Sequence, residues 1–277
     1  MRRGTTWAAA AAALLLAGGP VAAAAASTAA PPRRVASLNL CTDEIALLVA
    51  APGQLASVSW LAHGPKETAL AARARALHAN RGTIESVAAL QPDLIMTGGF
   101  APPYAAELAG RLGARTLDLP PPRSLAGLEA NIRAAGAALG QAARAEALVA
   151  AMRAALGPQP QRLQDAIIVQ GGGLTPSPEG LSAQLLRHAG LRQRALGGGR
   201  ASLELLLAHP PAVLVTSGYR AGETSLNNQW LQHPALQRLA ATTRRMTLDG
   251  RAFLCPGPLA AIEVARLRAN LAALPAR

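Results

Sequence analysis

Two similar stretches of sequence decide the fold: ESVAALQPDLIMTGGF at Glu85–Phe100 and ELLLAHPPAVLVTSGY at Glu204–Tyr219. Aligned without a gap, they match glutamate to glutamate, Pro92 to Pro211 and one aromatic residue to another. Each copy has the pattern of a helix end, a proline turn and a short buried strand that finishes in glycine and an aromatic ring. Because two copies are too few for a solenoid, the repeat predicts two similar lobes.

The residues between the two copies predict the connection between the lobes. From Ser124 to Leu156, apolar residues recur three, four or seven positions apart, which places them on one face of a helix. Ser124 is a suitable N-cap, and Gly157-Pro158 is a suitable end. A break is expected between Gly136 and Gly140, so we expect two helices, of which residues 141–156 form the connecting rod between the lobes.

Predicted strands alternate with predicted helices on both sides of this connection, which favours a parallel-type α/β fold in each lobe. The expected segments are a first lobe at 33–123, linking helices at 124–157 and a second lobe at 165–277. In the first lobe, we expect a strand at Val35–Leu40 and then a helix at Asp43–Val49, capped by Thr42 or Asp43. Ligands of such sheets collect beyond the carboxyl ends of the strands, so the cleft between the lobes is the expected site.

The N-terminus has the layout of a secretory signal peptide. Met1-Arg2-Arg3 is followed by an apolar Ala/Leu run and by small residues that suit cleavage near Ala26, so we expect residues 1–26 to be removed after export. The net charge is +12, but the arginines are scattered and aromatic residues make up only 3% of the chain. Without a basic stripe or a stacking platform, nucleic-acid binding is not expected.

The sequence shows no pattern of an enzyme or of a metal site. Gly171-Gly172-Gly173 lacks the spacing of a nucleotide-binding loop, and no serine stands in a nucleophile elbow. The five histidines are not spaced as metal ligands, and the acidic residues are dispersed. We therefore expect no catalytic residues, no metal ligands and no resident cofactor.

The two cysteines, Cys41 and Cys255, leave three alternatives open. In an exported chain they can form a disulfide, which would tie one lobe to the other. They can also be thiols that line the cleft and touch a ligand, or unpaired cysteines without a role.

Rings and turn residues at strand ends are the candidate ligand contacts. Trp60, Phe100, Tyr219 and Phe253 fall at or just after predicted strand ends, where they suit a large and partly apolar ligand. The alternative is that they fill the cores of the lobes. Asn39 lies near the end of the first predicted strand and Cys41 directly follows that strand, and we add both to the candidates.

The chain resembles the periplasmic substrate-binding proteins of ABC importers for ferric siderophores and cobalamin. The resemblance rests on RRVASLNLCTDEIALLVA, on TIESVAALQPDLIMTGG and on the repeat of that unit. It implies two α/β lobes joined by one rigid backbone helix, with a metal chelate bound in the cleft and delivered to an ABC permease dimer in the inner membrane. It also implies a periplasmic location, and we expect a monomer. The alternative is an exported metal-binding, haem-binding or enzymatic protein on the same fold that uses Cys41 and Cys255.

The resemblance further implies docking residues. Members of this family dock on the permease through one exposed glutamate on each lobe, and Glu85 and Glu204 match those positions. We expect both to lie away from the strand ends that line the cleft. Arg123, Arg220 and Arg244 are expected near its rim, which favours an anionic chelate.

Overall fold

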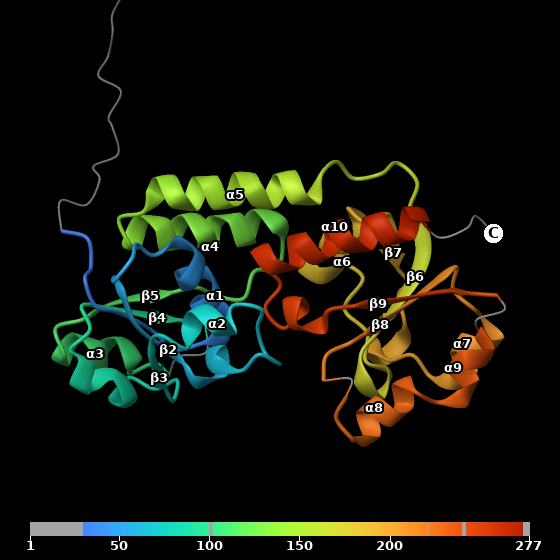
Figure 1. Cartoon of the computed structure of the whole chain (residues 1–277), viewed down its shortest axis with the longest axis horizontal. Helices are drawn as coiled ribbons and strands as arrows, with labels where there is room; N and C mark the ends of the chain where they lie inside the picture. The colour runs from blue at the N-terminus through green and yellow to red at the C-terminus, as the bar shows by residue number, and fades with distance from the viewer. Residues whose placement is uncertain (1–29, 100–101, 221, 240–241, 274–277) are drawn as a thin grey trace, which may run out of the picture. The chain divides into compact units, whose positions relative to one another are not determined.

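The computed structural model describes residues 30–99, 102–220, 222–239 and 242–273. The predicted signal peptide lies outside these residues. Two parallel sheets organise the chain (Figure 1). We call the part built on the first sheet the first lobe and the part built on the second sheet the second lobe.

The first sheet has the strand order β3-β2-β1-β4-β5, and all its neighbouring strands are parallel. Its strands are β1 (Val35–Ser37), β2 (Leu55–Ser59), β3 (His78–Asn80), β4 (Leu94–Thr97) and β5 (Arg115–Asp118). The accompanying helices are α1 (Leu40–Val49), α2 (Ala71–Ala74), α3 (Ala105–Arg111) and the 3₁₀ helix Glu85–Leu90. The chain builds outward from β1 in one direction and then from β4 in the other, so the topological switch point lies between β1 and β4.

The second sheet has the order β7-β6-β8-β9 and is also parallel. Its strands are β6 (Gln164–Val169), β7 (Leu191–Gln193), β8 (Val213–Ser217) and β9 (Arg244–Leu248). Its helices are α6 (Leu181–Arg187), α7 (Leu203–Ala208), α8 (Leu226–Leu231), α9 (Pro234–Arg238) and α10 (Pro258–Ala273). The two-lobed parallel α/β fold expected from the repeat is confirmed, and the second switch point lies between β6 and β8.

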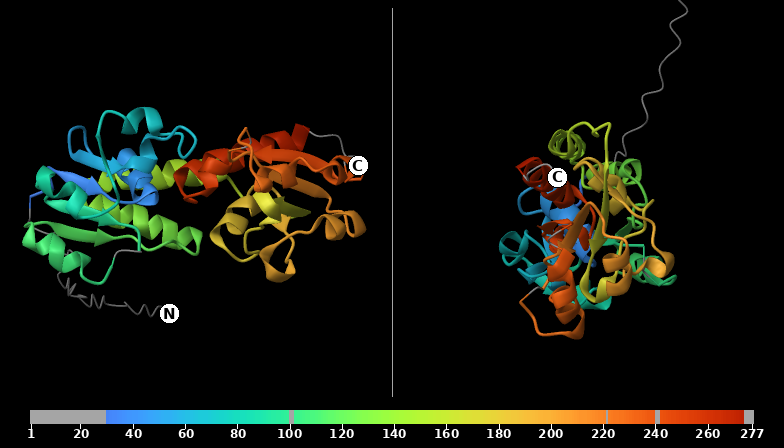
Figure 2. Two further views of the ribbon diagram at one scale, coloured as in Figure 1. Left: turned by 90° about the horizontal axis from the view of Figure 1, so that it is seen from below. Right: turned by 90° about the vertical axis from the view of Figure 1, so that its right-hand side faces the viewer.

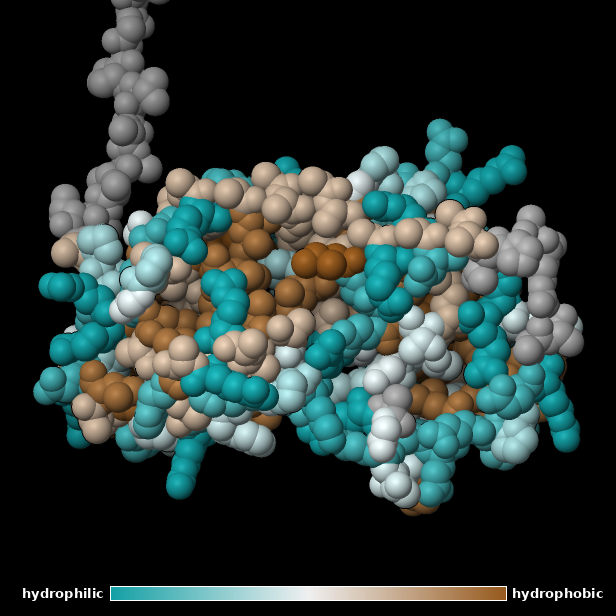
Figure 3. All heavy atoms as spheres, in the orientation of Figure 1, coloured by the Kyte–Doolittle hydropathy of each residue, from teal (hydrophilic) through white to brown (hydrophobic). Residues whose placement is uncertain are grey.

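Two helices connect the sheets along the chain, as the pattern predicted. Ser124 caps α4 (Leu125–Ala138) by accepting a hydrogen bond from the backbone N–H of Gly127, and α5 (Ala142–Leu156) follows after a short turn. The two helices lie side by side, and α5 also packs against α10 (Figures 1 and 2). Gly136 permits the close approach, because a Cβ there would collide with the Cβ of Ala145. Alanine dominates α5, and its outer surface is accordingly tan in Figure 3.

Alternating strand residues build cores on both faces of each sheet. Val35 and Met96 belong to the largest hydrophobic cluster. Ile95, the neighbour of Met96 in β4, points to the other face of the sheet and belongs to a smaller cluster that also contains Val87. The second sheet alternates in the same way. The largest cluster includes residues from both sheets and from α4, α5 and α10, so a continuous apolar core joins the lobes.

The start of the first lobe differs from the expected limits. β1 ends at Ser37, and α1 begins at Leu40, so Cys41 lies in the first turn of the helix and not at the end of the strand. The prediction that Thr42 or Asp43 caps the helix is wrong. The cap is Asn39, whose side-chain oxygen accepts a hydrogen bond from the backbone N–H of Cys41 at 2.9 Å, a role for which asparagine is as suitable as aspartate.

Candidate functional site

The first switch point places Asn39 and Gly98 next to each other. Asn39 follows β1 and Gly98 follows β4, and the carboxyl ends of these parallel neighbours share one edge of the sheet. A Cβ on Gly98 would stand 2.7 Å from the Cγ of Asn39, so only glycine allows the β4 loop to lie on the asparagine amide. In open α/β sheets, this crevice is where ligands bind.

Two cavities open at this point and share Asn39 and Gly98. The first, which we call the edge cavity, has a volume of about 180 Å³ and lies within the first lobe, between the loops that follow β1, β3 and β4 and the helix α3. The second, which we call the bridge cavity, has a volume of about 260 Å³ and is lined by α1, α4, the loop after β5 and residues 254–258 of the second lobe. The bridge cavity is therefore closed by both lobes.

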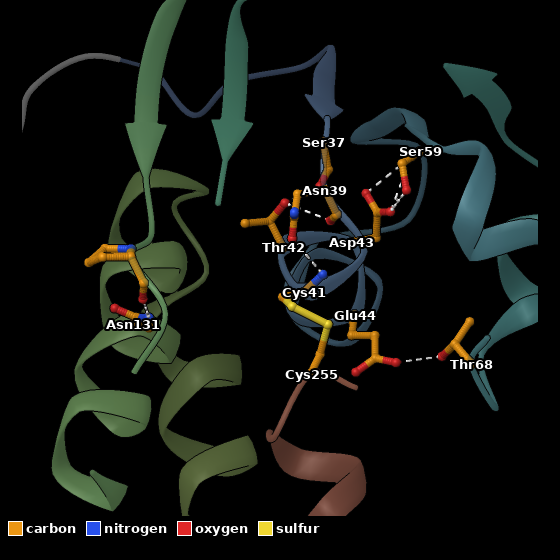
Figure 4. The surroundings of a disulfide bond; sticks show 11 residues. Ser37, Asn39, Cys41, Thr42, Asp43, Glu44, Ser59, Thr68, Asn131 and Cys255 are labelled. Carbon is orange, nitrogen blue, oxygen red and sulfur yellow. Dashed lines mark hydrogen bonds between the residues drawn. A yellow bond between two sulfur atoms is a disulfide. The ribbon is translucent and has the colours of Figure 1, made fainter. Parts of the chain in front are cut away.

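A disulfide between Cys41 and Cys255 forms part of the wall of the bridge cavity. It joins the first turn of α1 to the segment that precedes α10, and the two Cα atoms are 5.0 Å apart (Figure 4). Of the three alternatives that the sequence left open, the structure has the disulfide. Both sulfurs are consumed in it, and neither is present as the thiolate that binds metal ions.

Two consecutive carboxylates are buried in the first turns of α1. Asp43 accepts hydrogen bonds from the backbone N–H and the hydroxyl of Ser59, and Glu44 accepts one from the Thr68 hydroxyl at 2.6 Å (Figure 4). Burial raises the pKa of each carboxyl group to about 7, because removal from water disfavours the charged form. These buried acids were not predicted, since acidic residues in a first helical turn ordinarily face solvent.

A set of polar contacts joins the lobes at the loop that follows β2. Glu67 is only 8% exposed and pairs with Arg220, and Glu67 Oε2 also accepts a hydrogen bond from the Tyr219 hydroxyl at 2.8 Å. Lys66 pairs with Glu223 at 2.7 Å. We call these five residues the latch. A third cavity, of about 350 Å³, lies beside it and is open to solvent.

Within the latch, the charge of Arg220 also acts on the ring of Tyr219. The guanidinium group of Arg220 lies 5.3 Å from the centre of the Tyr219 ring, within the range of a cation–π contact. Burial, and then the bond to Glu67, raise the pKa of the Tyr219 hydroxyl. Next to the latch, Arg251 donates a hydrogen bond across the lobes to the carbonyl of Pro65 at 2.7 Å.

A family profile described as "Periplasmic binding protein" matches residues 35–250, which is most of the chain. The chain belongs to the periplasmic binding protein family. The family implies a periplasmic location, and its members ordinarily work with an ABC permease. A search of curated protein sequences finds no match to this chain.

Solved structures of periplasmic binding proteins share the fold. A periplasmic haem-binding protein from Pseudomonas aeruginosa is 24% identical, with a TM-score of 0.64 over 86% of this chain and 92% of that one. The haem-binding protein HutB of Vibrio cholerae is 17% identical, with a TM-score of 0.64 over 86% of this chain and 98% of that one. The molybdate-binding protein MolA of Haemophilus influenzae is 20% identical, with a TM-score of 0.64 over 87% of this chain and 86% of that one. At these identities, the likeness concerns the fold.

The predicted ligand residues of this periplasmic binding protein lie at separate places. Trp60 is 60% exposed at the end of β2, and Tyr219 belongs to the latch. Phe253 is half-buried against the main core and lines a fourth, narrow cavity with Ser217. Asn39 lies between the edge and bridge cavities, and Phe100 lies outside the described residues. Within the described parts of the chain, no two of these aromatic rings line the same one of the four cavities.

Glu85 and Glu204 are both exposed near the starts of equivalent helices. Hydrogen bonds at the start of α7, from its own backbone and from Ser202, lower the pKa of Glu204. The expectation that both glutamates stand away from the ligand edge is wrong for Glu85, which lines the edge cavity. The physical reason is that a helix that follows a parallel strand begins at the carboxyl edge of the sheet. The same holds for α7, which follows β7, but Glu204 lines none of the four cavities.

The arginines expected at the rim give little support for an anionic ligand. Arg244 is the first residue of β9 and therefore lies at the amino edge of its sheet, so this part of the expectation is wrong. Arg220 is at the interface, but Glu67 and Glu223 neutralise it. Arg123 is exposed beside the linking helices.

Two further findings concern membranes and metals. In residues 30–273, apart from the short gaps named above, no helix is long and apolar enough to cross a membrane. The same residues contain no group of three His, Cys, Asp or Glu side chains that could hold a metal ion.

Proposed function

We propose that this periplasmic binding protein captures a metal chelate and delivers it to an ABC permease without chemical change. The observation that carries the proposal is the pair of adjoining cavities at the first switch point, one of which is closed by both lobes. A ligand that fills both cavities contacts both lobes, so its binding would stabilise the arrangement in which they meet.

A ferric siderophore and a cobalt corrinoid are the first candidate ligands. The neighbours from Pseudomonas aeruginosa and Vibrio cholerae, described as haem-binding, add haem as a second candidate. Haem is wide, planar and largely apolar. The apolar wall of the bridge cavity, which includes Leu119, Leu128 and Leu254, suits such a body.

Tryptophan fluorescence tests these candidates. Purified protein is titrated with a ferric trihydroxamate, cyanocobalamin and haemin, and calorimetry gives the affinity independently of optical overlap. One of the three should bind saturably at one site, and the Trp60→Phe variant shows whether the exposed Trp60 ring reports the event. If none binds and the purified protein carries a bound metal, receptor function for a chelate is refuted.

Glu85 and Glu204 are the proposed docking pair. Arginine recognises carboxylate in a bidentate geometry, and two carboxylates held on packed helices present a fixed spacing to a permease dimer. Replacing Glu204, which lines neither cavity, with alanine should leave the affinity for the soluble ligand within about twofold, since exposed substitutions usually shift free energies by less than about 0.5 kcal/mol. Because Glu85 lines the edge cavity, transport by the double alanine variant is measured at saturating ligand. Transport should fall strongly, because removing one member of a paired charge at an interface costs about 2–5 kcal/mol.

The matched control is the double substitution Glu107→Ala and Glu179→Ala, which removes two other exposed glutamates. Uptake by vesicles that contain the permease is measured for both variants. Equal uptake by the docking variant and the control would show that Glu85 and Glu204 are ordinary surface residues.

A further inference from the structure

The bridge cavity has an apolar wall and one charged side chain. Its aliphatic and proline side chains come from α1, the loop after β5, α4 and the segment before α10; they are Ile45, Leu119, Pro121, Pro122, Leu128, Leu254, Pro256 and Pro258. The polar residues that line it are Asn39, Thr42, Glu44 and Asn131. Among all the lining residues, only Glu44 carries a charge. A single ionisable acid, whose pKa burial raises to about 7, therefore stands in a largely apolar chamber.

Glu44 is placed to receive a donor from a ligand. Glu44 is only 2% exposed, and its carboxylate oxygen Oε1 accepts the hydrogen bond from the Thr68 hydroxyl. Figure 4 shows one carboxylate oxygen facing Thr68 and the other facing the disulfide. Within the described parts of the chain, no donor is bonded to this second oxygen, Oε2.

The charged form of Glu44 is unfavourable in the empty cavity, which is why burial raises its pKa to about 7. A buried charge is costly unless it is paired and hydrogen-bonded, and the Thr68 hydroxyl is neutral and serves one oxygen only. A cation that enters the cavity would supply the missing partner. A second carboxylate would be repelled, and a neutral alkyl group would leave the oxygen unpaired.

We propose that the bridge cavity binds the aliphatic arm of a ligand that ends in an ammonium group, with Glu44 Oε2 as the acceptor of its N–H. The apolar wall accommodates the methylene chain, and the carboxylate selects the cationic end. The inference deepens the proposed function, on which it rests, by naming the class of chelate: one that carries a pendant alkylammonium group. It runs against the anionic ligand that the arginines suggested.

The first experiment tests the cavity without a chelate. n-Pentylammonium and n-pentanol are titrated into the full protein, and binding is followed by ligand-observed NMR. Pentylammonium should bind saturably and about tenfold or more tighter than pentanol, because hydrogen bonds to charged groups are the stronger ones. Glu44→Gln keeps the size of the side chain and should abolish this preference, whereas Glu107→Gln, an exposed control, should keep it.

A second variant guards against a folding defect in Glu44→Gln. Leu254 is partly exposed and lines the cavity, so Leu254→Lys can place an internal ammonium group near Glu44 without disturbing the core. This variant should fail to bind pentylammonium while keeping the circular dichroism of the parent. Pentylammonium binding that persists in both variants, or that is absent from the parent protein, overturns the proposal.

The second experiment uses a matched pair of chelates. Ferrioxamine B, a ferric trihydroxamate with a free pentylammonium arm, is compared by calorimetry with its N-acetyl derivative, which has lost the charge. The parent should prefer the ammonium form by about tenfold or more, and Glu44→Gln should bind the two forms alike. Equal affinities in the parent overturn the inference while leaving the receptor function intact. Loss of all chelate binding, with pentylammonium binding intact, overturns the receptor function instead.

Discussion

Removing the disulfide between Cys41 and Cys255 should destabilise the protein strongly. The two residues are 214 positions apart, so the bridge closes most of the described chain into one loop. In the chain-entropy description, a loop of this length corresponds to about 5 kcal/mol of stabilisation at 25 °C, the upper end of the observed range. For a protein of this size, that loss lowers Tm by roughly 10–20 °C.

The assay is thermal unfolding of the parent, of Cys41→Ser, of Cys255→Ser and of the double variant. Either single substitution breaks the bridge, so all three variants should unfold at similar temperatures, and the parent should join them in reducing buffer. The free energy of unfolding from urea titration gives an independent value. A parent whose Tm falls by less than about 3 °C on reduction would refute the argument, because the bridge would then add little to a chain already held by its shared core.

Four other substitutions test the charged groups. Asp43 has a folded pKa of about 7, above the usual value of 3.8, so the folded state favours its protonated form. The stability that this provides is lost as the pH rises from about 4 to about 7. The free energy of unfolding, measured with urea across this range, should depend less on pH in Asp43→Asn, and an unchanged pH dependence would exclude Asp43 as the cause. Glu129→Ala should lower the free energy of unfolding by about 1–2 kcal/mol, because the side chain is 5% exposed and pairs with arginines on both α4 and α5. The exposed Glu146→Ala should change it by less than about 0.5 kcal/mol, and equal losses would contradict the reasoning. Glu67→Gln should release Arg220 and speed hydrogen exchange in both latch loops, and unchanged exchange would show that the latch does not hold them.

The sequence predicted the elements that carry strong patterns. The first copy of the repeat contains the strand β4 and the second contains β8, as predicted. The break between α4 and α5 falls near Gly140, close to where the pattern indicated it. The edge strands β3 and β7 escaped prediction because each has only three residues and two of the three are polar, whereas the equally short β1 lies in a more apolar stretch. The segment Glu85–Leu90 was expected as an ordinary helix but is a 3₁₀ helix, a difference that apolar spacing over one or two turns does not resolve.

The candidate site was harder to predict because its chemistry depends on burial. Asp43 and Glu44 resemble the acidic residues that favour a helix N-terminus in solvent. One signal could have identified them: the rest of α1, from Ile45 to Val49, is apolar on every side, and a helix of that kind is enclosed by the protein. Glu67 offered no comparable signal, since its partners Tyr219 and Arg220 are far away in the sequence and only the folded chain brings them together.

The shared core, the disulfide and the latch together determine how this periplasmic binding protein can admit a ligand. The core through α4, α5 and α10 and the bond between Cys41 and Cys255 cannot be opened without unfolding or reduction, whereas the ion pairs of the latch can exchange with water. Opening is therefore expected at the latch, with the disulfide as a fixed point beside the bridge cavity. The latch and the bridge cavity are connected directly along the chain. Glu67 of the latch is followed by Thr68, whose hydroxyl donates a hydrogen bond to Glu44 in the cavity. A cation bound at Glu44 would thus act on the loop that must move to let it in.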